Sequence, residues 1–575
     1  MSAHRLVRVA LTVLDVEPWA LAPRGFPAFL WHDAAAGCEL AAFGRLDAGA
    51  VSLARSSIAE HREAARHRPL EHQRAAGDAA GHDAAGHDAA GHDAAERDAA
   101  GHDALPCPAL PLLLAALPFA EGSPPHASAR AASLPWGALG SLGVWLPRWL
   151  AVRSGGVTTL LGHGLAESDA EARRMRERLG SELAVWGKSR REVARTTTPY
   201  RDDPAAGDGG ERGANDAAVH GASDEAVRGS SDGAERFAFV ATVREALAAI
   251  ASAALAKAVV ARTRRLLAPP GARFDAFAQA CALRRELAGR RQEQAGGLRQ
   301  EQAGAPRAEQ AGGVVYALFD DEDRAFVGCT PELLFRLNGA TLRTAALAGT
   351  SPSPDLGGAT QRGAARANAM QPDATRADAM RADEKLRREH ALVVRGIERA
   401  LEPLAESVRA SETPRTVAAG SVLHLETPIE ARLRPGVDAL SVRNALHPTP
   451  ALGGSPTCAA LAFLAQHERL ARGLYGGNPG WVAPNGDACF AVAIRCALLG
   501  PTEAICFAGA GIVLGSVPES EWLETEHKLA TAIGSLRVVS AERQAHEPRL
   551  AHEPRLAHEP RLAQVPPLAL TEARS

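Results

Sequence analysis

The sequence predicts a mixed α+β fold, because helical and strand-like hydrophobic periods occur side by side in the same part of the chain. Residues 237–265 carry apolar side chains at intervals of three to four and predict a long helix that leads into Val259 and Val260. Short apolar runs bounded by turn residues predict strands at 313–320, 325–329, 333–337, 490–499 and 504–508. The C-terminal half is the more regular part of the pattern.

The composition excludes several classes of function. The 575 residues hold 64 lysines and arginines against 67 aspartates and glutamates, a net charge of -3, so we expect no nucleic-acid partner. The eight cysteines contain no C-x-x-C pair, which argues against a zinc site or a disulfide framework and favours a cytoplasmic location. The apolar stretch 109–120 is interrupted by Pro111 and Pro118 and is shorter than the ~20 residues of a membrane helix, so no membrane association is expected.

Much of the length is biased in composition. Short polar repeats such as Gly-His-Asp-Ala-Ala bury too little apolar surface to offset the entropy of ordering. We therefore assign 1–235 to an N-terminal part of the fold, 236–540 to a second and more regular region, and 541–575 to a disordered repeat tail. Low-complexity insertions are expected at 77–104, 201–235, 289–313 and 351–382.

A charged helix is predicted to begin at Pro518. The spacing of Glu521, Glu524 and Lys528 puts all three on one face. Two carboxylates one turn apart suit a hard cation such as Mg²⁺, although an exposed face with pairing between residues four apart would show the same pattern. Just upstream, a predicted glycine turn at 509–511 follows a strand, and its backbone N–H groups could approach an anion closely.

The segment FAGAGIVLGSVPESEWLETEHKL (507–529) resembles the C-terminal signature of the chorismate-utilising enzymes. The other blocks of that family follow its order: LAKAVVAR (255–262), FVGCTPELLFRLNG (326–339), LRTAALAGT (342–350), EKLRREHALVV (384–394), LHLETPIEARLRPG (423–436), ALHPTPALGGSP (445–456) and FAVAIRCALL (490–499). The resemblance implies an α+β fold in which two related halves pack their β-sheets in the core with helices outside. Region 236–540 would then be the chorismate-binding catalytic region, and the N-terminal part would complete the sheets.

Within this family the sequence resembles the isochorismate synthases. Ala348 stands where aminodeoxychorismate synthases typically place a nucleophilic lysine, and Lys257 stands where anthranilate synthases typically have glutamine. Water rather than ammonia is therefore the implied nucleophile, and no glutamine amidotransferase subunit is expected. The resemblance implies a monomeric isomerase that converts chorismate reversibly to isochorismate for menaquinone or siderophore synthesis. A salicylate synthase, which also eliminates pyruvate, and a non-catalytic chorismate-binding scaffold stay open as alternatives.

The same resemblance assigns roles to individual residues. It makes Lys257 the general base that activates water and Glu332 the general acid that protonates the leaving C4 hydroxyl; the base needs a lowered pKa and the acid a raised one. Glu389 and Glu524 would bind Mg²⁺, with Glu521 supporting them. The residues expected to bind substrate are Gly349, Thr350, His447, Arg495, Gly509, Gly511 and Lys528. Taken alone, Lys257 and Arg495 could be surface charges beside strands, Glu332 could cap a turn, and His447 could be a core histidine.

Four positions depart from the family pattern. Leu386 replaces a common aspartate, Glu426 adds a charge to the LHLETP block, and Ala431 replaces a usual glycine. Asn478 and the following proline alter the turn before a tryptophan. None of these departures removes an expected catalytic residue.

Overall fold

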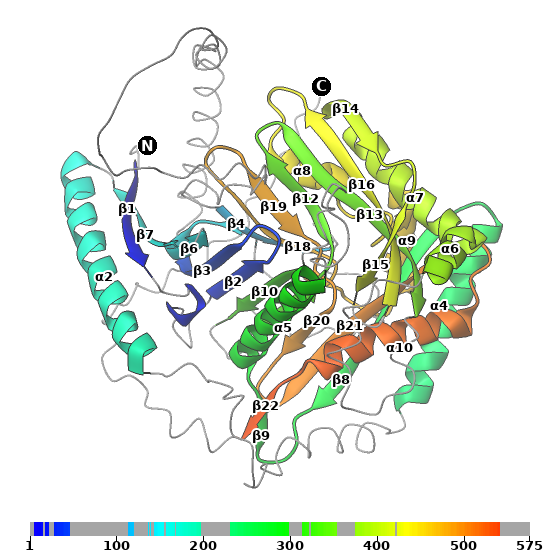
Figure 1. The fold of residues 1–575 in the computed structure, drawn as a ribbon. Helices are drawn as coiled ribbons and strands as arrows, with labels where there is room; N and C mark the ends of the chain where they lie inside the picture. The colour runs from blue at the N-terminus through cyan, green and yellow to red at the C-terminus, as the bar shows by residue number, and fades with distance from the viewer. Residues whose placement is uncertain are drawn as a thin grey trace, which may run out of the picture.

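Two large sheets form the core of the molecule (Figure 1). The computed structural model describes residues 5–14, 18–21, 28–45, 113–119, 136, 139, 143–154, 157–166, 168–196, 231–297, 313–320, 324–352, 374–419 and 422–540. The larger sheet has the order β1 (Arg5–Leu14), β7 (Val157–Ala166), β6 (Pro147–Ser154), β3 (Cys38–Arg45), β2 (Ala28–Asp33), β10 (Val314–Phe319), β11 (Ala325–Thr330), β20 (Cys496–Leu499), β21 (Glu503–Ile512), β8 (Lys257–Leu267) and β17 (Gly454–Ser455).

The smaller sheet has the order β14 (Ala405–Ala410), β16 (Val422–Leu433), β13 (Thr341–Pro352), β12 (Leu333–Asn338), β19 (Ala488–Ala491), β18 (Asn478–Val482), β4 (Leu113–Leu117) and β5 (Val144–Trp145), with β15 (Arg415–Ala419) also paired to β16. A separate two-stranded ribbon joins β9 (Ala272–Phe274) to β22 (Val538–Ser540). Helical segments are η1 (Pro18–Leu21), α2 (Asp169–Thr196), α4 (Ser231–Ala251), α5 (Ala276–Gly297), α6 (Ala374–Ala382), α7 (Glu384–Leu401), α8 (Ala439–Leu446), α9 (Thr457–His467) and α10 (Pro518–Gly534).

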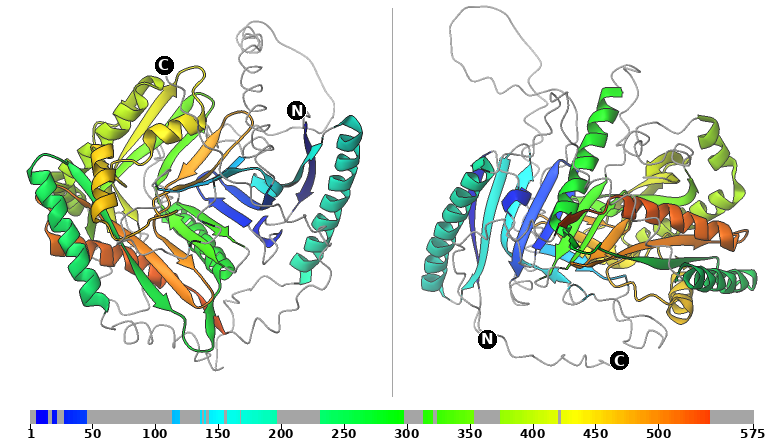
Figure 2. Two further views of the ribbon diagram at one scale, coloured as in Figure 1. Left: turned by 180° about the vertical axis from the view of Figure 1, so that it is seen from behind. Right: turned by 90° about the horizontal axis from the view of Figure 1, so that it is seen from below.

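Apolar side chains fill three layers around these sheets. One cluster, which includes Trp31 and Tyr316 of the larger sheet and Trp481 of the smaller, lies between the two sheets. A second packs α2, α5 and α10 on the larger sheet, and a third packs α4, α7, α8 and α9 against the smaller sheet and the β8–β21 end of the larger one. Figure 2 shows α2 and α4 at opposite sides of the molecule, outside the strands. The predicted α+β fold, with sheets in the core and helices outside, is confirmed.

The N-terminal part completes both sheets. Strand β2 pairs antiparallel with β10, so that Leu30 lies opposite Ala317, and β4 pairs with β18, so that Ala115 lies opposite Gly480. The two regions separated at residue 235 in the sequence therefore share one set of sheets. Within the described ranges, no helix combines the length and apolar character needed to span a membrane.

Several predicted boundaries are wrong. The helix predicted over 237–265 is α4 (Ser231–Ala251), followed by a turn in which Ala253 has φ 60° and then by strand β8. The strand predicted over 490–499 is two strands, β19 and β20, separated where Arg495 adopts φ 53°. The first six residues of β8 are buried and include four consecutive apolar ones, and periodicity cannot distinguish so short a run from the continuation of a buried helix.

The low-complexity predictions are partly outside the described residues and partly corrected. Ranges 77–104, 201–230, 298–312, 353–373 and 541–575 lie outside. Helix α4 begins at Ser231, α5 continues to Gly297, β13 continues to Pro352, and 374–382 forms α6. Alanine-rich sequence is a good helix former, so biased composition alone does not exclude a helix.

Candidate active site

Lys257 and Glu389 form a buried ion pair between strand β8 and helix α7. The Lys257 ammonium donates to Oε1 of Glu389 at 3.0 Å, and the lysine side chain is only 1% exposed. Burial alone would raise the pKa of Glu389, but the neighbouring ammonium groups, Lys257 first, hold it below its usual value. A Cβ at Gly511 on the adjacent strand β21 would collide with the Glu389 carboxylate, so this glycine makes room for the pair.

Helix α7 brings Glu389 into the site because its two faces differ. Asp383 caps the helix by accepting a hydrogen bond from the backbone N–H of Leu386 at 2.9 Å. The buried stripe includes Leu386, Val393, Ile397 and Leu401. Lys385 lies one turn before Glu389, so the two side chains leave the helix on neighbouring surfaces.

Helix α10 contributes two carboxylates and a lysine, as the spacing predicts. The Lys385 ammonium of α7 donates to Oε1 of Glu521 at 2.6 Å, and Glu521 is 1% exposed. Lys528 donates to Oε1 of Glu524 at 2.6 Å and to the carbonyl oxygen of Gly509 at 2.8 Å. Burial, and next the like charge of Glu524, raise the pKa of Glu521.

Arg262 of β8 contacts a neighbouring face of α10. Its guanidinium stacks 3.7 Å from the ring centroid of Trp522, and its Nε donates to Oγ1 of Thr525 at 2.7 Å. It also pairs with Glu526. Because Arg262 both stacks on α10 and forms hydrogen bonds with it, it restricts the rotation of α10 about its axis more than a single contact would. Arg262 therefore orients the helix face that carries Glu521 and Glu524.

Glu332 lies between β11 and β12 and is 9% exposed. Its backbone N–H donates to Oγ1 of Thr330 at 3.2 Å, and its carbonyl oxygen accepts from the backbone N–H of Val492 at 3.0 Å. Burial raises the pKa of Glu332 to about 7, although the positive charges of Lys257, Arg495 and Lys528 partly oppose that rise. The carboxyl group is thus available as a proton donor near neutral pH, in the neighbourhood of Lys257.

Arg495, His424 and Thr350 form a chain of hydrogen bonds. The Arg495 guanidinium donates to Nε2 of His424 at 3.2 Å, and Thr350 Oγ1 lies 3.1 Å from Nδ1 of the same ring. Burial, and then the charges of Arg495 and Lys528, lower the pKa of His424 well below its usual value, so the ring is neutral. Because Nε2 accepts from Arg495, Nδ1–H must donate to Thr350, which leaves the threonine hydroxyl proton for another acceptor.

The remaining residues expected to bind substrate differ in their surroundings. Gly349 has φ 78°, and an added Cβ would lie 3.1 Å from the carbonyl oxygen of Leu386. Gly509 and Gly511 lie within strand β21, so the predicted glycine turn is wrong. Tertiary pairing of β21 with β8 overrides the local preference of glycine for a turn.

His447 is held by contacts with residues that do not belong to the candidate site. Its Nε2 lies 2.9 Å from the carbonyl oxygen of Phe119, and its ring meets the Phe119 ring edge-on at a centroid distance of 6.0 Å. Burial, and then the charge of Arg443, lower its pKa to about 3. These contacts fit a neutral core histidine, and they give no support to the prediction that His447 lines the site.

Three residues of the group were absent from the sequence-based set: Lys385, His424 and Tyr475. Lys385 could have been found from its spacing of four from Glu389, and His424 lies in the LHLETP block. Tyr475 had no comparable signal. Its hydroxyl lies 3.1 Å from where a Cβ on Gly509 would be, and Tyr475 and Arg495 interact electrostatically.

The donor chemistry of the group fits a hard divalent cation. Carboxylate oxygens are the side-chain ligands that Mg²⁺ prefers, and Glu389, Glu521 and Glu524 all act electrostatically on one ammonium group, that of Lys385. In the described ranges, no three His, Cys, Asp or Glu side chains are close enough together to hold a metal ion. Each of the three glutamates is instead paired with a lysine. Mg²⁺ binding therefore stays a prediction.

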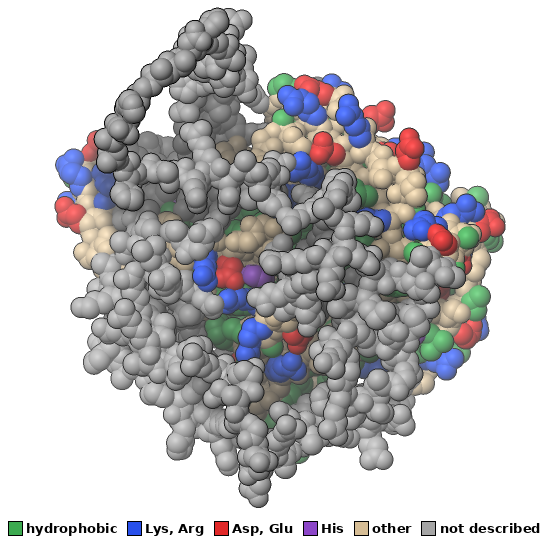
Figure 3. Space-filling view, viewed as in Figure 1, with side chains coloured by type: hydrophobic (Ala, Val, Ile, Leu, Met, Phe, Trp, Pro, Cys, Tyr) green, Lys and Arg blue, Asp and Glu red, His purple; other side chains and the backbone are tan. Residues whose placement is uncertain are grey.

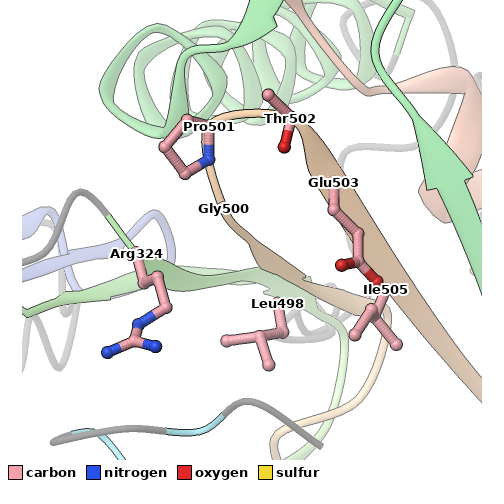
Figure 4. Close-up of a pocket in the computed structure, with 7 residues that line it drawn as sticks. All are labelled: Arg324, Leu498, Gly500, Pro501, Thr502, Glu503 and Ile505. Carbon is pink, nitrogen blue, oxygen red and sulfur yellow. The ribbon is translucent and has the colours of Figure 1, made fainter.

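A surface pocket lies away from this group. It has a volume of about 260 Å³ and surrounds the turn between β20 and β21, as Figure 4 shows. Its lining residues are Arg324, Leu498, Gly500, Pro501, Thr502, Glu503 and Ile505. None of the predicted site residues lines it, and it lies at the opposite end of β21 from Gly509 and Gly511. Figure 3 shows acidic and basic side chains interspersed along the edge where Figure 1 draws α7 and α10.

Departures from the family pattern are accommodated locally. Leu386 packs in a small apolar cluster with Met380, Leu423 and Leu425. Glu426 pairs with Arg415 of the neighbouring strand β15. Asn478 is buried, where its side-chain oxygen accepts from Arg443 Nε at 3.1 Å. None of these contacts involves Lys257 or Glu332.

Comparison with known proteins relates the part of the chain that carries most of the candidate site to a protein family. Residues 304–537 match the family described as chorismate binding enzyme. Residues 304–537 are called the chorismate-binding region below, after the family that they match. Lys257 precedes the matched residues, but β8 pairs with β21 and Lys257 binds Glu389, so it lies against the chorismate-binding region.

Individual relatives of the chorismate-binding region carry related names. The chain is 40% identical over 224 residues to a salicylate biosynthesis isochorismate synthase from Pseudomonas aeruginosa, covering 38% of this chain and 44% of that relative. It is 35% identical over 207 residues to an isochorismate synthase from Escherichia coli strain K12, covering 36% of this chain and 50% of that relative. The chain thus spans about half the length of the curated relatives it matches.

A solved structure extends the likeness to the rest of the fold. The menaquinone-specific isochorismate synthase from Escherichia coli matches with a TM-score of 0.56 and 21% identity, covering 92% of this chain and 95% of that one. At this identity the likeness concerns the fold. It agrees with an N-terminal part that completes the sheets of the chorismate-binding region.

Proposed function

We propose that this protein is an isochorismate synthase, an isomerase that converts chorismate reversibly to isochorismate. The observation that carries the proposal is the buried group in which Lys257 and Glu332 lie within electrostatic reach of each other. A base and an acid are both needed because a hydroxyl must be added at one ring carbon and removed at another. The names of the relatives support the same reaction.

Lys257 is the proposed general base. To act as a base, the Lys257 ammonium, which is paired with Glu389, must first release its proton to solvent. The resulting amine takes a proton from a water molecule, and the water oxygen forms a bond to C2 of chorismate. The ring double bonds shift, and the bond between C4 and its hydroxyl oxygen breaks. Glu332 supplies the proton for the leaving hydroxyl, which departs as water, so one water enters and one leaves for each turnover. In the reverse direction the two residues exchange roles.

Protonated Glu332 is what the forward reaction requires. Burial raises the pKa of this carboxyl to about 7, so a large fraction holds a proton at neutral pH. A carboxyl with an ordinary pKa would be almost wholly ionised there. The pKa shift therefore supports Glu332 as the acid.

Cationic side chains around the group suit a substrate with carboxylates. We assign Arg495, with its bidentate guanidinium, and Lys528 to the substrate carboxylates. Thr350, whose hydroxyl proton is left available by His424, would donate to a third substrate oxygen. Gly349 and Gly511 are also assigned to the substrate site: a side chain at Gly349 would crowd Leu386, and one at Gly511 would collide with Glu389. Gly509 instead contributes its carbonyl oxygen to position Lys528.

Mg²⁺ is the proposed cofactor, with Glu389 and Glu524 as ligands and Glu521 in support. When bound, Mg²⁺ would neutralise a substrate carboxylate and hold it in place. Glu389 and Glu521 are buried, and the like charge of Glu524 acts on Glu521, so a cation beside these carboxylates is favourable. Whether the product enters menaquinone or siderophore synthesis depends on the enzymes that consume it. We expect the isomerase to act as a monomer in the cytoplasm.

Product analysis tests the proposal. The purified full chain is incubated with chorismate and MgCl₂, and the mixture is followed by proton NMR. We expect isochorismate and chorismate to reach the same ratio from either direction, and we expect excess chelator to stop the conversion. Salicylate plus pyruvate would favour the salicylate synthase alternative, and bound chorismate without turnover would favour the non-catalytic scaffold.

A further inference from the structure

Lys385 forms an ion pair with Glu521, one of the carboxylates of the proposed metal site. Its ammonium lies 2.6 Å from Oε1 of Glu521, a carboxylate that is 1% exposed, whereas the lysine side chain itself is 28% exposed. The Glu521 carboxylate also accepts a hydrogen bond from the side chain of Ser516, in the loop before α10. An ionised carboxylate so deeply buried needs a positive partner. Without a metal ion, Lys385 is that partner.

The other two predicted metal ligands are close enough to act on the same ammonium. Glu524 and Glu389 both contribute to the electrostatic field at Lys385, after the larger contribution from Glu521. Glu389 and Glu524 are each paired with a different lysine, at 3.0 Å and 2.6 Å respectively. Lys385 therefore pairs directly with Glu521 and lies within electrostatic reach of the other two proposed ligands.

Two full cations do not share such a position without cost. A lysine ammonium and a divalent ion a few ångströms apart repel each other strongly in a partly buried site. Lys385 can leave, because it stands in the first turn of α7 on a flexible four-carbon stem and is partly exposed. Lys257 is buried and lacks such an exit.

We propose that Lys385 is a resident counter-cation that pairs with Glu521 when no metal is bound and is displaced when Mg²⁺ binds. The proposal rests on the Mg²⁺ site of the proposed function. It makes Lys385 a residue that weakens metal affinity while it stabilises the metal-free protein. Metal binding then becomes an exchange of one internal cation for another.

The test compares Mg²⁺ binding by wild type, Lys385→Met and Lys385→Arg, using titration calorimetry of the full chain with MgCl₂ alone at pH 8. We expect Lys385→Met to bind Mg²⁺ on the order of tenfold more tightly than wild type, because competition and repulsion are both removed. Lys385→Arg keeps the charge and should stay close to wild type. Arg388→Met is the matched control, because Arg388 lies on the same helix but binds Glu384 and the carbonyl oxygen of Leu514.

Urea unfolding supplies the second readout. We expect the midpoint of Lys385→Met to fall below that of wild type without metal, and to recover when MgCl₂ is present. A midpoint that falls equally with and without Mg²⁺, or unchanged Mg²⁺ affinity in Lys385→Met, would overturn the proposal. Wild type that binds no Mg²⁺ would instead contradict the metal site of the proposed function, so the two failures are distinguishable.

Discussion

Replacement of Glu332 by glutamine should stabilise the folded protein while it removes activity. The pKa of this carboxyl is about 7 in the folded state, against an ordinary value of 4.5. Between these two values the folded state holds a proton that the unfolded state has released, so stability falls as pH rises through this range. Above pH 7 the full cost of a buried, ionised carboxylate is present.

The size of that cost follows from the pKa difference. The folded and ordinary pKa values of Glu332 differ by about 2.5, which corresponds to about 3 kcal/mol in the free energy of unfolding, since one pKa unit is worth about 1.4 kcal/mol. Glutamine cannot ionise, so the stability of Glu332→Gln relative to wild type should improve by about 2.5 kcal/mol between pH 5 and pH 8. At pH 5, where both proteins are uncharged at this position, the two should differ least.

Urea unfolding of both proteins at pH 5, 6, 7 and 8 measures this change. Glu406→Gln is the matched control: it replaces an exposed glutamate on β14, 47% exposed, and its difference from wild type should not vary with pH in this way. The activity of Glu332→Gln should fall at least about 10²-fold with chorismate still bound. A stability difference independent of pH, or one that shrinks as pH rises, would refute the reasoning that Glu332 is buried and desolvated.

Three further changes have defined outcomes. Lys257→Ala should stay folded, bind chorismate and lose at least about 10²-fold in kcat; near-normal kcat would mean that another group activates the water. Gly511→Ala should lower kcat by about 10²-fold, because its methyl group would displace the Lys257–Glu389 ion pair. Gly534→Ala is the control, because its added methyl group would meet no neighbouring atom within 4 Å, and it should leave kcat unchanged. Equal losses in the two variants would show that Gly511 does not make room for the ion pair. Removal of 77–104 together with the chain after 544 should change neither the melting temperature nor turnover, and a loss of several degrees would show that these repeats pack against the enzyme.

The sequence could predict which residues carry chemistry better than it could predict how they are held. Glu521, Glu524 and Lys528 follow from helical spacing alone, and the structure has them on one helix with Lys528 bonded to Glu524. The partner of Glu521 is Lys385, which lies on a different helix and 136 positions away in the chain. Such a pairing depends on how α7 and α10 pack, and no local pattern records it.

Glycine positions show the same limit. Gly509 and Gly511 suggest a turn in isolation, yet both lie in a strand paired with β8. Their missing side chains serve a tertiary purpose, because Gly511 makes room for Glu389. Likewise, nothing in the apolar run 490–499 signals a break, and the break is imposed where Arg495 adopts φ 53° to point its guanidinium at His424. Local preference yields to packing in both cases.

The origin of the new oxygen tests the central claim most directly. Chorismate is converted by the full chain in water enriched in ¹⁸O, and the isochorismate is collected at low conversion and weighed by mass spectrometry. Attack of a Lys257-activated water at C2 predicts one ¹⁸O atom in each isochorismate molecule. Unlabelled isochorismate would mean that the C4 hydroxyl migrates without exchange with water, and would contradict the proposed reaction.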